Sequence, residues 1–196
     1  MNPKRLHFES GRAGGTFHVE DTRTWGRNNF RRFLAWKKDP DGGPEYTQAM
    51  GAAIADGLRG LFGGYLPADA VIVTPPPGRA RFGTYPAGAL AAELRRLTGL
   101  DLVDALARTC GRRGRGVRAS LKAVHGIALR RAVHGLAVLV DDVITTGRTL
   151  EAARAAIGGP SVGIAYVAWY AAESTARPDR IQCPNCGHTF TRKDQP

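Results

Sequence analysis

The sequence predicts an α/β protein in which a parallel sheet is flanked by helices. Short runs rich in β-branched residues are typical of buried strands, and they alternate with segments of helical periodicity. The expected strands are Asp69–Thr74, Leu136–Val140 and Ser161–Trp169, and the expected helices are Glu45–Leu61, Pro86–Leu97 and Thr149–Ile157. This alternation favours helices on both faces of the sheet, with ligands bound beyond the carboxyl ends of the strands.

The N-terminal segment is expected to be irregular over residues 1–40 and rich in basic residues. Within it, polar and apolar residues alternate over Thr16–Glu20. The segment Trp25–Lys38 (WGRNNFRRFLAWKK) combines arginines and lysines with aromatic residues. The turn cluster Asp39–Pro44 (DPDGGP) is a strong helix and strand breaker, so regular structure is expected to begin after it. Residues 1–44 are therefore predicted to be an N-terminal extension.

Two loops are predicted next to the strands of the core, which is expected to span residues 45–176. The strand Asp69–Thr74 (DAVIVT) is stopped by the rigid turn Pro75–Pro77. Arg108–Arg118 (RTCGRRGRGVR) is rich in glycine and arginine and has no apolar periodicity, so it is expected to be a mobile loop.

Length and charge restrict the class of protein. With 196 residues, 43% of them hydrophobic, the chain can bury one sizeable core. It has no apolar run of membrane-spanning length and no signal-peptide pattern, so a cytoplasmic protein without membrane contact is expected. A formal net charge of +11 attracts polyanions, which include nucleic acids, acidic partners and phosphorylated small molecules.

The segment Ala137–Leu150 (AVLVDDVITTGRTL) carries the clearest chemical pattern. Asp141 and Asp142, here called the acid pair, directly follow the expected strand, and glycine and hydroxyl residues precede the helix, with Thr149 as its expected cap. Backbone N–H groups of such a turn form an anion site at the positive end of the helix dipole. Adjacent carboxylates repel unless a cation or hydroxyl groups contact them, as Mg²⁺ and a ribose diol would.

This pattern resembles the phosphoribosyl-pyrophosphate loop of type I phosphoribosyltransferases. The resemblance implies that the acid pair contacts the ribose hydroxyls and Mg²⁺. It implies that the 5′-phosphate binds to Thr145, Thr146, Gly147, Arg148 and Thr149. The alternative is an acidic strand end followed by an N-capped helix, which is common in α/β proteins.

Two further segments are similar to the ComF-type branch of that family, namely Leu34–Gly42 (LAWKKDPDG) and Val71–Pro77 (VIVTPPP). The resemblance implies that residues 1–44 form a small hood and that a pyrophosphate loop runs over Thr74–Arg79, with contacts from Thr74, Gly78 and Arg79. Arg81–Thr84 departs from the Arg-Gly-Phe-Asn run usual in this branch, which leaves the acceptor and the activity open.

The loop Arg108–Lys122 matches the flexible catalytic loop of the family in position. The basic residues that could close over pyrophosphate are Arg112, Arg113, Arg115, Arg118 and Lys122, of which Arg113 and Arg115 are the expected catalytic residues. The alternative is a solvated basic loop that contacts nucleic acid or nothing.

The C-terminal tail, residues 177–196, contains a C-x-x-C motif that resembles one knuckle of a zinc ribbon. Cys183 and Cys186 are the expected zinc ligands, and His188 is a third candidate. Because four ligands complete a structural site, the fourth is Cys110, another histidine or a second copy of the chain in a homodimer. The alternative is an exposed C-x-x-C without metal.

Three functions are compatible with these residues. The first is Mg²⁺-dependent phosphoribosyl transfer from phosphoribosyl pyrophosphate to a base, an amine or ammonia, a reaction of nucleotide metabolism. The second is a non-catalytic sensor of the same metabolite that binds nucleic acid through its basic residues. The third is a metal-dependent hydrolase of nucleotides or diphosphates.

Overall fold

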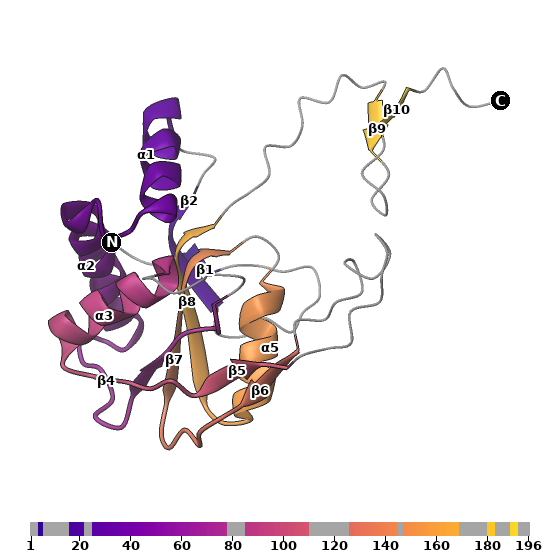
Figure 1. Ribbon diagram of the computed structural model, residues 1–196. Coiled ribbons are helices and arrows are strands. Elements are labelled where there is room, and N and C mark those ends of the chain that lie inside the picture. The colour runs from indigo at the N-terminus through magenta and orange to yellow at the C-terminus, as the bar shows by residue number, and fades with distance from the viewer. Residues whose placement is uncertain are drawn as a thin grey trace.

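The computed structural model describes residues 4–5, 16–21, 25–77, 85–109, 126–144, 147–168, 180–182 and 189–191. Its main sheet has six strands in the order β1-β2-β8-β7-β3-β4. The bounds are β1 Lys4–Arg5, β2 Thr16–Asp21, β8 Ser161–Ala168, β7 Ala137–Ile144, β3 Val71–Val73 and β4 Asp101–Leu102. All neighbours are parallel except β1, which is antiparallel to β2. The predicted mostly parallel α/β sheet is confirmed (Figure 1).

Helices cover both faces of this sheet, as the sequence predicts. Figure 1 shows α2 and α3 on one side and α5 on the other. The helices are α1 Arg27–Lys38, α2 Pro44–Leu61, α3 Pro86–Thr98 and α5 Arg148–Ile157. Both α2 and α3 begin with a proline, which lacks the N–H that a first helical residue would leave unpaired.

Successive side chains of β7 belong alternately to two hydrophobic clusters, one on each face of the sheet. Val138 and Val140 face the cluster built from α1, α2 and α3, whereas Ala137 and Leu139 face the cluster that contains Leu150 of α5. Successive side chains of a strand point to opposite faces. The side chains of Asp141 and Asp142 therefore leave the strand toward opposite faces of the sheet.

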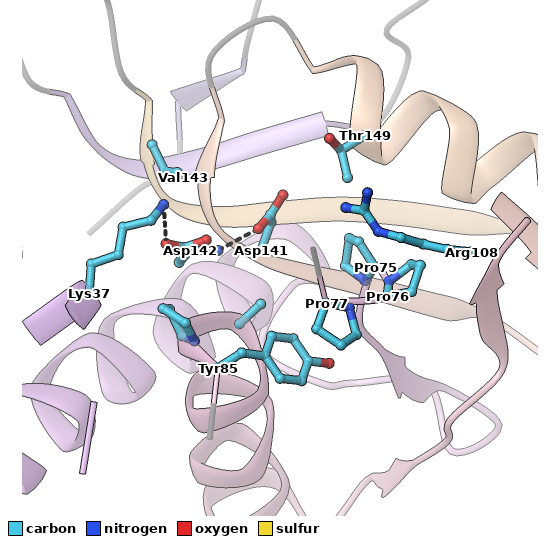
Figure 2. A pocket seen from close by; sticks show the side chains of 12 residues that line it. Lys37, Pro75, Pro76, Pro77, Tyr85, Arg108, Asp141, Asp142, Val143 and Thr149 are labelled. Carbon is cyan, nitrogen blue, oxygen red and sulfur yellow. Dashed lines mark hydrogen bonds and ion pairs between the residues drawn. The ribbon is translucent and has the colours of Figure 1, made fainter. Parts of the chain in front are cut away.

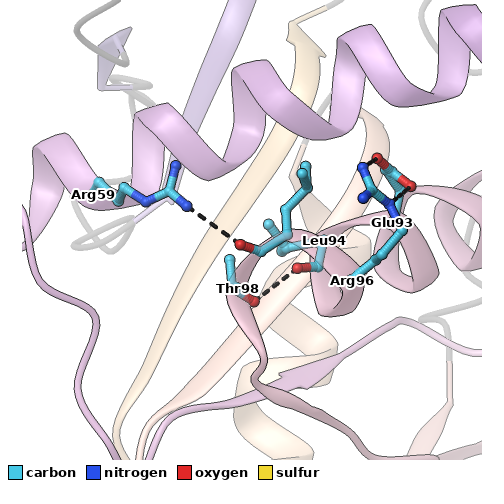
Figure 3. A network of polar contacts seen from close by, with 6 residues as sticks. Arg59, Glu93, Leu94, Arg96 and Thr98 are labelled. Atoms are coloured by element: carbon cyan, nitrogen blue, oxygen red, sulfur yellow. Dashed lines mark hydrogen bonds and ion pairs between the residues drawn. The ribbon is translucent and has the colours of Figure 1, made fainter.

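The contact between α2 and α3 is close. A Cβ atom at Gly51 of α2 would lie 2.5 Å from Cγ of Glu93 on α3, so only glycine fits this approach. One guanidinium nitrogen of Arg59 donates a 3.3 Å hydrogen bond to the carbonyl of Leu97 near the end of α3. Figure 3 shows this contact beside the pairing of Glu93 with Arg96. The two helices thereby form one layer over the sheet.

The N-terminal segment differs from the expectation of irregular structure, which was wrong. Residues 16–21 form β2, which pairs in parallel with β8, and residues 27–38 form α1. Of the side chains on α1, only Phe33 and Trp36 are buried. The helix exists because these two aromatic residues pack on the sheet and on α2, so tertiary contacts outweigh the unusually basic composition.

Two further expectations about β7 and α5 were wrong. The strand does not end at Val140 but continues through the acid pair to Ile144, because its pairing with β8 extends to Ala168. Gly147, with a left-handed backbone (φ 72°), is the N-cap of α5, so Thr149 is not the cap but lies in the first turn. Glu151 also lies in that turn.

Two small antiparallel sheets complete the described elements. One pairs β5 Leu106–Arg108 with β6 Ile127–Leu129. Arg108, expected in a mobile loop, is therefore the last residue of a strand. The other sheet pairs β9 Arg180–Gln182 with β10 Thr189–Thr191. None of the described helices is long and apolar enough to cross a bilayer.

Candidate functional site

A cavity of about 360 Å³ lies at the carboxyl end of the sheet, beyond β3 and at the end of β7. Its polar wall contains the acid pair together with Lys37, Arg108 and Thr149. Its other wall is largely apolar and is lined by Pro75, Pro76, Pro77, Tyr85, Pro86 and Ala87. The cavity is therefore at the edge where α/β sheets bind ligands, as the sequence predicts. Figure 2 shows the two walls.

The acid pair lies at the centre of the polar wall. The backbone N–H of Asp142 donates a 2.9 Å hydrogen bond to Oδ1 of Asp141, and both residues line the cavity. Burial raises the pKa of Asp141 well above its usual range, and the negative charge of Asp142 raises it further. A cation or hydroxyl donor that enters this cavity would relieve both effects.

Lys37 is the cation nearest to the acid pair in the described part of the chain. Its Nζ lies 2.6 Å from Oδ2 of Asp142, although α1 and β7 are far apart in sequence. The position of α1 is set by Phe33 and Trp36, whose rings pack against Tyr46 of α2 and Tyr166 of β8. Trp36 also donates a 2.8 Å hydrogen bond from Nε1 to Oγ1 of Thr47. The aromatic packing thus places the lysine at the cavity.

The turn before α5 contributes to the same cavity. Gly147 is buried with a left-handed backbone, and its residue type suits that conformation because it has no Cβ. No side chain of the described residues caps the first turn of α5, so its N–H groups point past Gly147 without a side-chain acceptor. Thr149 lines the cavity, whereas Arg148 is exposed and is not among the lining residues.

The apolar wall is ordered by one polar contact. The hydroxyl groups of Thr74 and Tyr85 hydrogen-bond each other, which connects the end of β3 to the start of α3. Burial raises the pKa of Tyr85, so the phenol stays protonated at neutral pH. Thr74, predicted to contact pyrophosphate, is thus already paired with a side chain of the protein.

The structure brings together part of the predicted site. Asp141, Asp142 and Thr149 share the cavity, with Gly147 and Arg148 adjacent in sequence. The other predicted residues lie outside the described part of the chain and stay predictions: Gly78, Arg79, Arg112, Arg113, Arg115, Arg118, Lys122, Thr145, Thr146, Cys110, Cys183, Cys186 and His188. Among the described residues, no group of three or more histidine, cysteine or acidic side chains forms a metal site.

The sequence-based site omits Lys37, Arg108 and Tyr85, all of which line the cavity. A signal for Lys37 exists: Phe33 and Trp36 are three residues apart, the spacing of one helix face, and the lysine directly follows that face. Arg108 was expected at the start of a mobile loop and was not among the predicted site residues. In comparisons with known proteins, this chain matches no protein-family model and no curated protein sequence.

Proposed function

We propose that this protein is a Mg²⁺-dependent phosphoribosyltransferase of the ComF-like type, with phosphoribosyl pyrophosphate as donor and a base, an amine or ammonia as acceptor. The observation that carries the proposal is the placement of two adjacent carboxylates and Thr149, from a helix start that no described side chain caps, in one cavity at the carboxyl end of a parallel strand. A phosphorylated sugar needs both features at once, because its phosphate is an anion and its diol is a hydrogen-bond donor.

The start of α5 is suited to the 5′-phosphate. Its first-turn N–H groups lack a side-chain acceptor among the described residues, and the helix dipole adds partial positive charge there. Thr149 adds a hydroxyl on the cavity side. The acid pair is then close enough to contact the ribose hydroxyls of the same molecule.

The acid pair also fits a divalent cation. Two carboxylates are too few for a cage made by the protein alone, but Mg²⁺ commonly binds one or two carboxylates together with the phosphates of its substrate. When bound, Mg²⁺ would neutralise charge on the diphosphate leaving group. Asp142 is nearly buried and carries a charge that already attracts a cation, which supports this assignment.

The residues of the chain contribute positioning and electrostatics rather than a covalent nucleophile. The nitrogen lone pair of the acceptor forms the new bond to the anomeric carbon, the bond to the diphosphate oxygen breaks, and diphosphate leaves with that electron pair. Arg108 lies at the cavity with its positive charge available to the departing anion.

The test is Asp142→Asn, with release of pyrophosphate from phosphoribosyl pyrophosphate and Mg²⁺ measured against a panel of bases, amines and ammonia. Loss of the carboxylate should lower kcat/KM by about a hundredfold or more, the range for a lost electrostatic contact in a transition state. The matched control is Asp101→Asn, which neutralises an exposed carboxylate of β4 outside the cavity. Unchanged turnover in the Asp142 variant would contradict the proposal.

A second candidate is a non-catalytic sensor of the same metabolite that binds nucleic acid. The basic helix α1 favours it, since Arg27, Arg31 and Lys38 are exposed and the helix has no acidic residue. A zinc knuckle at Cys183 and Cys186, completed across a homodimer, would suit either candidate. Absence of pyrophosphate release together with a gel shift that weakens steeply with salt would select this candidate.

A further inference from the structure

The ion pair between Lys37 and Asp142 places a cation of the protein where a metal ion would contact the acid pair. The separation of 2.6 Å between Nζ and Oδ2 is direct contact, with no room for an ion between the two atoms. A second cation at this oxygen is repelled by the ammonium, because two positive charges so close together raise each other's energy, and it binds more tightly once the ammonium has moved away. Lys37 and a metal ion therefore compete.

The two partners differ in their freedom to move. The side chain of Lys37 is 38% exposed and that of Asp142 only 9%, so the lysine is the partner that can leave. The ammonium of a lysine is attached through a flexible four-carbon stem. The helix that carries it is fixed by Phe33 and Trp36, so rotation of the side chain is sufficient and α1 need not move.

The lysine has an anion to move to when a diphosphate binds. Lys37 lines the same cavity as Arg108 and Thr149, and the Nζ also lies 6.0 Å from the centre of the Phe33 ring. An ammonium that leaves Asp142 still lines this cavity, where a bound diphosphate would offer it phosphate oxygens. The cavity can thus exchange one ion pair for two, with a metal ion on the acid pair and the lysine on the diphosphate.

We infer that Lys37 is a tethered counter-ion of the acid pair, which excludes free divalent metal from the empty site and moves to a diphosphate oxygen when metal and diphosphate bind together. The inference rests on the proposed function for the identity of the donor, but its physical content concerns only metal and diphosphate. Metal then enters this site with the diphosphate and not before it.

The test is Lys37→Met, which keeps an unbranched apolar stem of similar size and removes the charged ammonium. Isothermal titration should show Mg²⁺ alone, and Mn²⁺ alone, binding about tenfold more tightly to this variant than to the wild type. Inorganic pyrophosphate in the presence of a metal chelator should bind about tenfold more weakly. A merely structural lysine cannot give these opposite directions.

Three further variants complete the test. Lys38→Met removes the exposed charge of the neighbouring residue and should leave the affinities for metal and for pyrophosphate unchanged. Lys37→Arg keeps the charge and should exclude metal as the wild type does. Should Lys37→Met fail to fold, as thermal denaturation would show, Lys37→Met combined with Asp142→Asn removes both charges of the pair and should lose the tighter metal binding along with the diphosphate contact.

The outcomes separate this inference from the proposed function. Opposite shifts in Lys37→Met support the counter-ion even if no phosphoribosyl transfer is found with any acceptor. Equal losses of both affinities, or no change in either, overturn the counter-ion even if the wild type is an active transferase. In the double variant, metal binding tighter than in the wild type would also overturn it, because Asp142 would then not be the contested ligand.

Discussion

The two faces of the main sheet are built from different kinds of side chain. The cluster under α1, α2 and α3 contains Phe33, Trp36, Met50 and other large side chains. The cluster under α5 has no buried aromatic residue among those described, and half of its buried residues are alanines. Large interlocking side chains fix the helices above them, and small ones let a helix approach closely. The first face therefore positions Lys37, and the second places the start of α5 near the acid pair.

The two carboxylates of the acid pair also differ in their partners. Asp142, on the face of α1, has a lysine as its partner, while Asp141, on the face of α5, has the N–H of Asp142 and a raised pKa. Among the described residues, Asp142 is thus in direct contact with a cation, whereas Asp141 accepts a backbone hydrogen bond and has no cation within ion-pair distance. Asp141, the carboxylate without a cation in contact among the described residues, therefore lies on the face where we propose that the phosphorylated sugar binds.

Removal of the buried Phe33 ring should change the free energy of unfolding more than any other substitution considered below. Phe33→Ala should lower the free energy of unfolding by about 3–5 kcal/mol, because a fully buried ring is replaced by a cavity. Leu150→Ala on the other face removes fewer atoms and should lower it by about 2–3 kcal/mol. Urea denaturation of both variants measures the difference. A smaller loss in Phe33→Ala than in Leu150→Ala would show that α1 is not fixed by this ring.

An intermediate effect is expected at Asp141. Its raised pKa means that the folded protein binds this proton more tightly than the unfolded chain does. The stability contribution is therefore fully present below the unfolded pKa and is lost as pH rises toward the folded pKa. Asp141→Asn removes this loss and should raise the free energy of unfolding at pH 8.

Thermal denaturation from pH 4 to pH 8 checks the Asp141 prediction. The variant should have a flatter profile of Tm against pH than the wild type, with the largest gain at the alkaline end. Asp101→Asn, which changes an exposed carboxylate, is the control and should leave the profile unchanged. Parallel profiles for wild type and Asp141→Asn would show that this carboxylate is not destabilised by burial.

The smallest effect should come from the polar contact beneath α1. Thr47→Val keeps the shape of the side chain but removes the acceptor of the Trp36 indole N–H. A loss of about 0.5 kcal/mol is expected, the lower end for a hydrogen bond that is only partly buried. Denaturation would detect it, and metal affinity should stay as in the wild type, since Lys37 keeps its place. A change in metal affinity would mean that this contact also orients the lysine.

Much of the fold was predictable because its central strands carry their own signal. The β-branched runs at β3, β7 and β8 and the proline starts of α2 and α3 depend on local sequence alone. The helix α1 was not predicted, since its basic residues hide a face made of only two buried aromatic residues. Local composition cannot report a helix whose stability comes from packing against distant parts of the chain.

The candidate site shows the same division. Asp141, Asp142 and Thr149 are close in sequence and so form a motif that can be recognised. Lys37, Arg108 and Tyr85 join them in the cavity from separate elements, and only the folded chain brings them there. The continuation of β7 through the acid pair likewise depends on its neighbour, because pairing with β8 keeps two carboxylates in a strand.

The parallel pairing of β2 with β8 has a consequence for folding during synthesis. Thr16 pairs with Gly163, so a strand that leaves the ribosome early meets this neighbour only when most of the chain has been made. Contacts between such distant segments slow folding, since a long loop must close before they form. Until then β2 has an open edge toward the missing strand, and nascent chains that stop short of residue 161 should be prone to aggregate and to require chaperones.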